Sequence, residues 1–239
     1  MPGDSSFSGR SAIGCPGARL KPLREPRLTR FSGHHLVCFR GERTVFENLD
    51  FELADGGALV LRGPNGSGKS SLLRLMAGLA RPLSGALIWD NETVADDAEA
   101  HHRRLHYVGH ADPVKPALTV AENLRFWSAL RGDGAAAVSV AVGRALDGFG
   151  IAHLADLPGR YLSAGQRRRA NLARVMASSA VLWLLDEPAT ALDDSGVACL
   201  REAMAAHRAR GGMVVTSAHA DPLLAGGREL DLSQFRAAS

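Results

Sequence analysis

Apolar residues recur at two spacings in the first half of the chain, and each spacing predicts a different kind of element. From about residue 33 they alternate with polar residues up to a turn at 55–57, so this stretch is predicted to form short strands. The alternating positions are Leu36, Cys38, Val45, Leu49, Phe51 and Leu53. Residues 58–61 predict another strand, which runs into Gly63. After a loop the spacing becomes helical, at Leu72, Leu73, Leu75, Met76 and Leu79. The predicted order is strand, glycine-rich loop, helix.

The second half of the chain changes from helices alone to helices that alternate with strands. Residues 118–160 look helical, and Thr119 and Glu122 predict a capping box, which satisfies free backbone N–H groups of the first turn. Glycines at 132 and 134 separate this helix from another at about 135–149. Beyond Gly159 we expect a helix from about Gln166, a strand at 181–185, a helix at about 195–210 and a strand at 213–217. Such alternation predicts an α/β fold with a largely parallel sheet.

Composition limits the class of protein without identifying it. The net charge is +3 and the pI about 9.0, carried almost wholly by arginine, and this mild excess does not by itself imply nucleic acid. No apolar stretch approaches the roughly 18 residues that a membrane-spanning helix needs. Any membrane role is therefore expected to involve a partner. The three cysteines, at 15, 38 and 199, are too far apart for a metal site and favour free thiols in a reducing compartment.

Residues 1–30 differ from the rest, because they are rich in Pro, Gly, Ser and Arg and have no lasting apolar period. This composition predicts a disordered extension ahead of a domain at 31–239. An organelle transit peptide, an overlong bacterial reading frame and a solvated tail all fit the same composition.

Residues 63–71 read GPNGSGKSS and match the pattern G-x-x-x-x-G-K-[ST] at every fixed position. Glycines let consecutive backbone N–H groups turn toward a phosphate, the next helix adds its positive end, Lys69 reaches the β- and γ-oxygens, and Ser70 ligates Mg²⁺. The candidate nucleotide-binding residues are Gly63, Pro64, Asn65, Gly66, Ser67, Gly68, Lys69, Ser70 and Ser71.

Two acids, Asp186 and Glu187, follow the predicted strand at 181–185. Ligands of open α/β sheets bind at the carboxyl ends of the strands, so these acids are expected beside the phosphate loop. Asp186 is the candidate for holding Mg²⁺ through water. Glu187 is the candidate for orienting and deprotonating the attacking water, with Lys69 as a further catalytic residue.

Residues 162–166, LSAGQ, precede the acid strand by about twenty residues, and here the chain resembles the ATP-binding cassette (ABC) family, whose signature is LSGGQ. The resemblance covers about 33–230. It implies a mostly parallel core sheet, an antiparallel β subdomain and a helical subdomain at about 111–162. Ser163, Gly165 and Gln166 would face the γ-phosphate of a neighbouring chain's ATP, so the active species would be a homodimer. Asp193 looks like part of the D-loop, and His219 like the histidine that contacts the γ-phosphate.

Two positions depart from the family pattern. His110 stands where a glutamine usually touches Mg²⁺ and the water, and Arg40, beside Phe39, stands near the usual adenine-stacking aromatic. The block around His110, the arginines after LSAGQ and Trp183 in the acid strand together resemble the ATPase subunit of the heme exporter of cytochrome c maturation. This resemblance implies heme handling driven by ATP hydrolysis, with Mg²⁺ as the cofactor.

Several charged residues remain outside these motifs. His101, His102 and His106 could share a metal or heme, but a solvated surface is favoured, because they lie in a polar segment with several acidic residues. Arg167, Arg168, Arg169 and Arg174 are expected to form ion pairs or contact phosphates, not to bind nucleic acid.

The sequence therefore predicts an ABC-type ATPase bound to integral-membrane transporter subunits, which would contact residues 110–131. Its predicted location is the cytoplasmic face of the bacterial inner membrane, with the mitochondrial matrix side as the alternative. Two other functions stay open: the motor of a different ABC exporter, and a soluble ABC protein that acts on nucleic acid or ribosomes.

Overall fold

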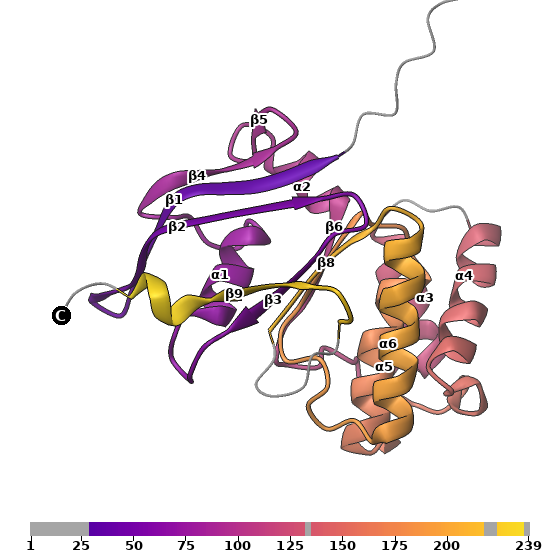
Figure 1. Cartoon of the computed structure of the whole chain (residues 1–239). Helices are drawn as coiled ribbons and strands as arrows, with labels where there is room; N and C mark the ends of the chain where they lie inside the picture. Colours follow the sequence, from indigo (N-terminus) through magenta and orange to yellow (C-terminus); the bar gives the residue numbers. More distant parts are fainter. Residues whose placement is uncertain (1–28, 132–134, 218–223, 237–239) are drawn as a thin grey trace, which may run out of the picture.

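The computed structural model describes residues 29–131, 135–217 and 224–236, which form two sheets and the helices around them (Figure 1). The antiparallel sheet has the order β2-β1-β4-β5, and the parallel sheet has the order β6-β7-β8-β3-β9. The antiparallel strands are β1 (Arg30–Arg40), β2 (Arg43–Ala54), β4 (Ser84–Trp89) and β5 (Glu92–Thr93). The parallel strands are β3 (Ala58–Arg62), β6 (Leu105–Val108), β7 (Leu182–Leu185), β8 (Met213–Ser217) and β9 (Arg228–Asp231). The predicted α/β class and largely parallel sheet are confirmed.

Helices cover both faces of the parallel sheet. Figure 1 shows α1 between the two sheets, with α3 to α6 on the opposite side of the parallel sheet. The helices are α1 (Lys69–Met76), α2 (Ala98–Arg104), α3 (Val120–Ala129), α4 (Ala135–Gly148), α5 (Ala164–Ala177) and α6 (Asp194–Ala209). Short 3-10 turns are η1 (Ala152–Leu154), η2 (Gly159–Tyr161) and η3 (Leu232–Phe235). None of the helices in the described ranges combines the length and the apolar character that a membrane crossing requires.

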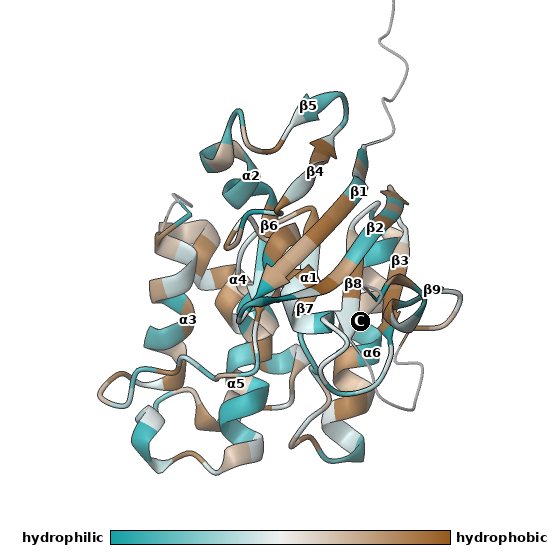
Figure 2. Cartoon of the chain, turned by 90° about the vertical axis from the view of Figure 1, so that its left-hand side faces the viewer, coloured by the Kyte–Doolittle hydropathy of each residue, from teal (hydrophilic) through white to brown (hydrophobic). Residues whose placement is uncertain are grey.

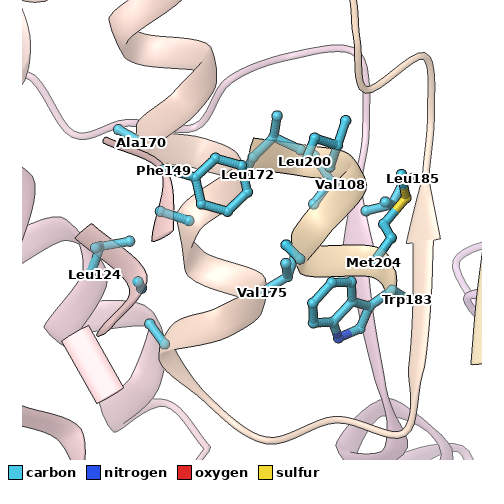
Figure 3. Packing of buried hydrophobic residues seen from close by; sticks show 14 of the residues in the cluster. Val108, Leu124, Phe149, Ala170, Leu172, Val175, Trp183, Leu185, Leu200 and Met204 are labelled. Carbon is cyan, nitrogen blue, oxygen red and sulfur yellow. The ribbon is translucent and has the colours of Figure 1, made fainter. Parts of the chain in front are cut away.

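The parallel strands supply both hydrophobic cores, because successive side chains of a strand point to opposite faces. In β7, Leu182 and Leu184 face α1 and the antiparallel sheet, whereas Trp183 and Leu185 face the helical layer. Figure 3 shows Met204 of α6 reaching β7 on that second side. In Figure 2 β1 and β3 are mostly brown, whereas α2 and α5 are largely teal. The buried strands thus hold their carboxyl-terminal loops in fixed positions.

Two expectations about element length were wrong. The apolar alternation at 33–53 was expected to form short strands, but it belongs to two long paired strands, β1 and β2. Register shifts between these strands interrupt the period of two, so the sequence pattern looks broken where the strand continues. The helix after the glycine loop ends at Met76, before the predicted Leu79. Gly78 takes a left-handed φ of 71°, which stops the helix and leaves Leu79 exposed.

The subdomain limits stay predictions, although several element bounds bear on them. β1 begins at Arg30, and the Thr29 N–H donates to Asp55, so the described fold starts inside the segment 1–30 that we expected to be disordered. Residues 1–28 of that segment lie outside the described residues. The segment 111–162 contains α3, α4 and two 3-10 turns, while α5, which starts at Ala164, packs against α3 and α4.

Candidate functional site

The glycine-rich loop joins the carboxyl end of β3 to the amino end of α1, in the order that the sequence predicts. Gly63, Gly66 and Gly68 have φ angles of 128°, 79° and 103°, which disfavour any residue with a Cβ. Gly68 is also the N-cap of α1, and a Cβ there would lie 2.7 Å from Val45 Cγ1. The loop therefore needs glycine both for its curvature and for its packing against β2.

Lys69 holds the loop in its curved form. Its ammonium group donates hydrogen bonds to the carbonyl oxygens of Gly63 (2.7 Å) and Pro64 (3.2 Å), although the residue is only 6% exposed. The Ser67 hydroxyl inside the loop is buried and has no hydrogen-bond partner among the described residues. Because buried polar groups nearly always have partners, this free hydroxyl fits a loop that receives a phosphate oxygen.

A cavity of about 400 Å³ opens beside this loop, which is within the usual size of small-ligand sites. Its walls come from the β1–β2 turn, the phosphate loop and the acid strand. The lining residues are Arg40, Gly41, Arg43, Val45, Asn65, Gly66, Gly68, Lys69, Ser70, Ser71 and Glu187. Three cations thus face one cavity, which suits a polyphosphate. The sequence analysis placed Arg40 here but missed Arg43 and Val45.

The two acids follow β7, where they are fixed by the neighbouring strand β8. The Ser217 hydroxyl donates to Asp186 Oδ1 (2.8 Å), and the Glu187 backbone N–H donates to the Ser217 oxygen (2.7 Å). Asp186 is 4% exposed, and Glu187 has a left-handed φ of 46°, which is uncommon for a non-glycine residue. Ser217 therefore positions both acids. Sequence reasoning missed it, because nothing local indicates that β8 pairs with β7.

The predicted signature segment caps α5. Ser163 is the N-cap, and its hydroxyl accepts from the Gln166 N–H (3.2 Å), while Gln166 Oε1 accepts from the Ser163 N–H (2.9 Å). Ser163 is exposed, whereas Gly165 and Gln166 are half-buried. None of the three lines the cavity. Gln166 therefore acts here as a capping residue, and the amino end of α5 remains accessible.

Asp193 and His110 also lie away from the cavity lining. Asp193 caps α6 by accepting from the Gly196 N–H (3.0 Å). The pKa of the Asp193 carboxyl is held below its usual range, mainly by the hydrogen bond from the Arg169 guanidinium and to a lesser extent by the one from the Gly196 N–H. His110 is exposed in the loop that follows β6. His219 lies outside the described residues.

The expectation that His101 and His106 are solvated was wrong, whereas His102 is exposed as expected. His101 Nε2 donates to the Met76 carbonyl (2.8 Å), and burial lowers the pKa of its ring. His106 Nε2 donates to the Ser178 carbonyl (3.3 Å), and burial, with Arg131 nearby, lowers the pKa of His106 to about 3. These two rings are parts of the core. No group of three or more potential metal ligands occurs in the described ranges.

Two of the arginines on α5 form ion pairs, as the sequence analysis expected. Arg168 pairs with Asp112 (3.0 Å) and Arg169 with Asp193. Arg174 donates to the Tyr107 carbonyl and lies over the ring of Trp127, with its guanidinium carbon 4.6 Å from the ring centre. Within the described residues, each of these side chains thus meets its own chain.

Comparison with known proteins gives one consistent assignment. The family model described as "ABC transporter" matches residues 46–190. The chain is 57% identical over 208 residues to "Cytochrome c biogenesis ATP-binding export protein CcmA" of Paramagnetospirillum magneticum, covering 87% of this chain and 96% of that protein. It is 56% identical over 205 residues to the protein of the same name from Rhodospirillum rubrum, covering 86% of each.

A solved structure described as "Structure of ATP binding subunit of ABC transporter" has the same fold. It superposes with a TM-score of 0.73 at 24% identity and covers 79% of each chain. At this identity the likeness concerns the fold alone, and it agrees with the family model and the relatives. On these matches, the chain belongs to the ABC transporter family and, within it, to the CcmA group of cytochrome c biogenesis ATP-binding export proteins.

Proposed function

We propose that this chain is the ATP-hydrolysing subunit of an export complex that handles heme during cytochrome c biogenesis. The main support for the proposal is that the phosphate loop and Glu187 line the same cavity. The names of the CcmA relatives support the biogenesis role. The resemblance of the block around His110 to heme exporter ATPases supports heme as the cargo.

ATP binds with its phosphates in the curved loop. The backbone N–H groups of residues 63–71 and the positive end of α1 face the phosphate oxygens. The Lys69 ammonium, already held at the loop by two carbonyls, is available to the β- and γ-phosphates. Arg40 and Arg43 extend the positive wall, and the flat guanidinium of Arg40 can stack on the base.

Ser70 and Asp186 are the residues that would hold Mg²⁺. A hydroxyl and a carboxylate are oxygen donors of the kind that this hard cation prefers. When it is bound, Mg²⁺ neutralises charge that develops on the phosphates. The Ser217 hydroxyl donates to one Asp186 oxygen and so fixes the orientation of the carboxylate.

Glu187 acts as the general base that takes a proton from the attacking water. Ser217 holds the Glu187 backbone through a hydrogen bond. Glu187 lines the same cavity as the phosphate loop. His219 would contact the γ-phosphate, and His110 would approach the water from the loop after β6.

Two copies of the chain form the active unit. Ser163, Gly165 and Gln166 do not line the cavity of their own chain, and Ser163 is exposed at the amino end of α5. That helix end is able to meet the γ-phosphate held by a second copy, with Asp193 at the same interface. Residues 110–131 contact integral-membrane subunits, and the complex is located on the cytoplasmic face of the inner membrane.

The function is tested by steady-state ATP hydrolysis and nucleotide binding with Mg²⁺. Glu187→Gln keeps the shape of the side chain but removes the base, so we expect turnover to fall by roughly 100-fold or more while binding of ATP is retained. Wild-type protein that neither binds nor hydrolyses MgATP would contradict the proposal. Heme handling is tested separately, by whether membrane subunits and heme copurify in detergent.

A further inference from the structure

One buried arginine on α5 contacts two of the loops that carry predicted catalytic residues, the loop of His110 and that of Glu187. Arg168 is 2% exposed, and each of its N–H groups has an acceptor. Nε donates to Pro188 O (3.2 Å), Nη1 to Gly109 O (3.2 Å) and Asp112 Oδ1 (3.0 Å), and Nη2 to Asp186 O (3.1 Å) and Glu187 O (2.7 Å). A single planar guanidinium therefore ties the loop after β6 to the loop after β7.

Asp112 is the ion-pair partner of this buried cation. Its side chain is 20% exposed, and its Oδ1 also accepts from Asn171 Nδ2 (2.7 Å) on the next turn of α5. Removing one partner of a buried ion pair leaves the other charge uncompensated, which costs far more than an exposed pair would. The position of the 109–112 loop and that of the Arg168 guanidinium are therefore coupled.

The contacts on Glu187 suggest what this coupling does. Glu187 has a left-handed φ of 46°, its N–H donates to Ser217, and its carbonyl accepts the shortest of the Arg168 bonds. Its backbone is thus held from both sides in a conformation that a non-glycine residue rarely takes. Without the Arg168 guanidinium, the Asp186 and Pro188 carbonyls would lose this donor, and the Glu187 carbonyl would keep only its bond from the Thr190 N–H (3.2 Å).

We propose that Arg168, paired with Asp112, is a positioning residue that sets the place of Glu187 according to the position of the 109–112 loop. The proposal rests on the function proposed above, with Glu187 as the base. Arg168 touches neither the nucleotide cavity nor the phosphate loop, so it acts through the Glu187 backbone. Because residues 110–112 begin the segment that would meet the membrane subunits, a movement of this loop would change the rate of hydrolysis.

Arg168→Lys is the main variant, because lysine keeps the charge but lacks the planar fork of donors. A misplacement of about 1 Å costs about 100-fold in rate, so we expect kcat to fall between about 10- and 100-fold. KM, and the Kd for a fluorescent N-methylanthraniloyl ATP, should stay within about twofold, because the phosphate loop is untouched. Asp112→Asn keeps the acceptor atom and removes the charge, so it tests the same ion pair from the other side. We again expect kcat to fall while KM stays nearly unchanged.

Arg174→Lys is the matched control. Arg174 is another buried arginine of α5, but it donates to the Tyr107 carbonyl and lies over the Trp127 ring, and these contacts do not involve the acid pair. We expect its kcat to stay within about threefold of wild type. A fall in kcat equal to that of Arg168→Lys would show that general loss of packing on α5 is responsible, and would overturn the proposal.

A double-mutant cycle with Glu187→Gln separates positioning from a structural role. If Arg168 acts through Glu187, Arg168→Lys should lower the residual single-turnover rate of Glu187→Gln by less than about twofold. Full additivity would overturn the proposal, as would a rise in KM equal to the fall in kcat. A wild type without MgATP turnover, or a fully active Glu187→Gln variant, would instead contradict the proposed function.

Discussion

His106 provides a pH-dependent test of how the helical layer is joined to the sheet. It lies on β6, is 8% exposed, and its Nε2 contacts both the carbonyl (3.3 Å) and the hydroxyl (3.1 Å) of Ser178 at the end of α5. The perturbation is His106→Gln, because a glutamine amide can still donate to the Ser178 carbonyl but does not titrate. Wild type and variant are compared at pH 7 and pH 5.

The magnitude follows from the pKa of His106, which burial and then Arg131 lower from 6.5 to about 3. Below pH 6.5 the unfolded chain binds a proton that the folded chain does not, so stability is greatest above this pH and falls on acidification. Each pH unit in this window changes the free energy of unfolding by about 1.4 kcal/mol. Between pH 7 and pH 5, His106 alone should therefore lower the stability of the wild type by about 2 kcal/mol.

The assay is urea unfolding, followed by far-UV circular dichroism, at the two pH values. We expect the wild type to lose about 2 kcal/mol more than His106→Gln between pH 7 and pH 5. His102→Gln, which changes an exposed ring, should lose as much as the wild type. Equal losses in wild type and His106→Gln would contradict this prediction, because His106 would then be free to take up a proton in the folded state.

Two further variants test the phosphate loop. Lys69→Ala removes a charged donor, and hydrogen bonds from charged groups contribute about 2 kcal/mol. The Kd for MgATP, measured by titration calorimetry, should therefore rise roughly 30-fold. An unchanged Kd would exclude Lys69 from binding. Gly68→Ala places a Cβ 2.7 Å from Val45 at a φ of 103°, and strain of about 1 kcal/mol with overpacking of about 2 kcal/mol should lower the melting temperature by roughly 10 °C. Gly143→Ala, where a Cβ meets nothing within 4 Å, is the control.

The parts of the site that the sequence predicts are those in which chemistry follows from short-range order. The phosphate loop needs glycines followed by a lysine at the start of a helix, and the structure places Gly63 to Lys69 in that geometry. The capping box of Thr119 and Glu122 is confirmed with both of its hydrogen bonds. In these cases partner residues are close along the chain, so a local pattern is enough.

The residues that the sequence did not reveal depend on contacts between distant segments. Ser217 meets Asp186 only because β8 pairs with β7, and Arg168 meets Asp112 across 56 positions. His101 sits in a polar stretch, yet it packs against Phe31 and Trp89 with ring centroids 5.7 and 6.0 Å away. Local polarity therefore gave the wrong environment for this histidine, since strand order and layer packing decide its burial.

In the proposed dimer, the Ser163 end of α5 from one copy of the chain completes the nucleotide site of the other copy. The most direct test of this arrangement is sedimentation velocity of Glu187→Gln with and without MgATP, in the Ser163→Asn and Ser163→Asp backgrounds. Both substitutions keep a good N-cap, but only aspartate places a negative charge against the γ-phosphate. We expect MgATP to produce dimers with Ser163 and Ser163→Asn and only monomers with Ser163→Asp, although all three bind ATP. Equal dimer formation by all three, or none by any, would contradict the account.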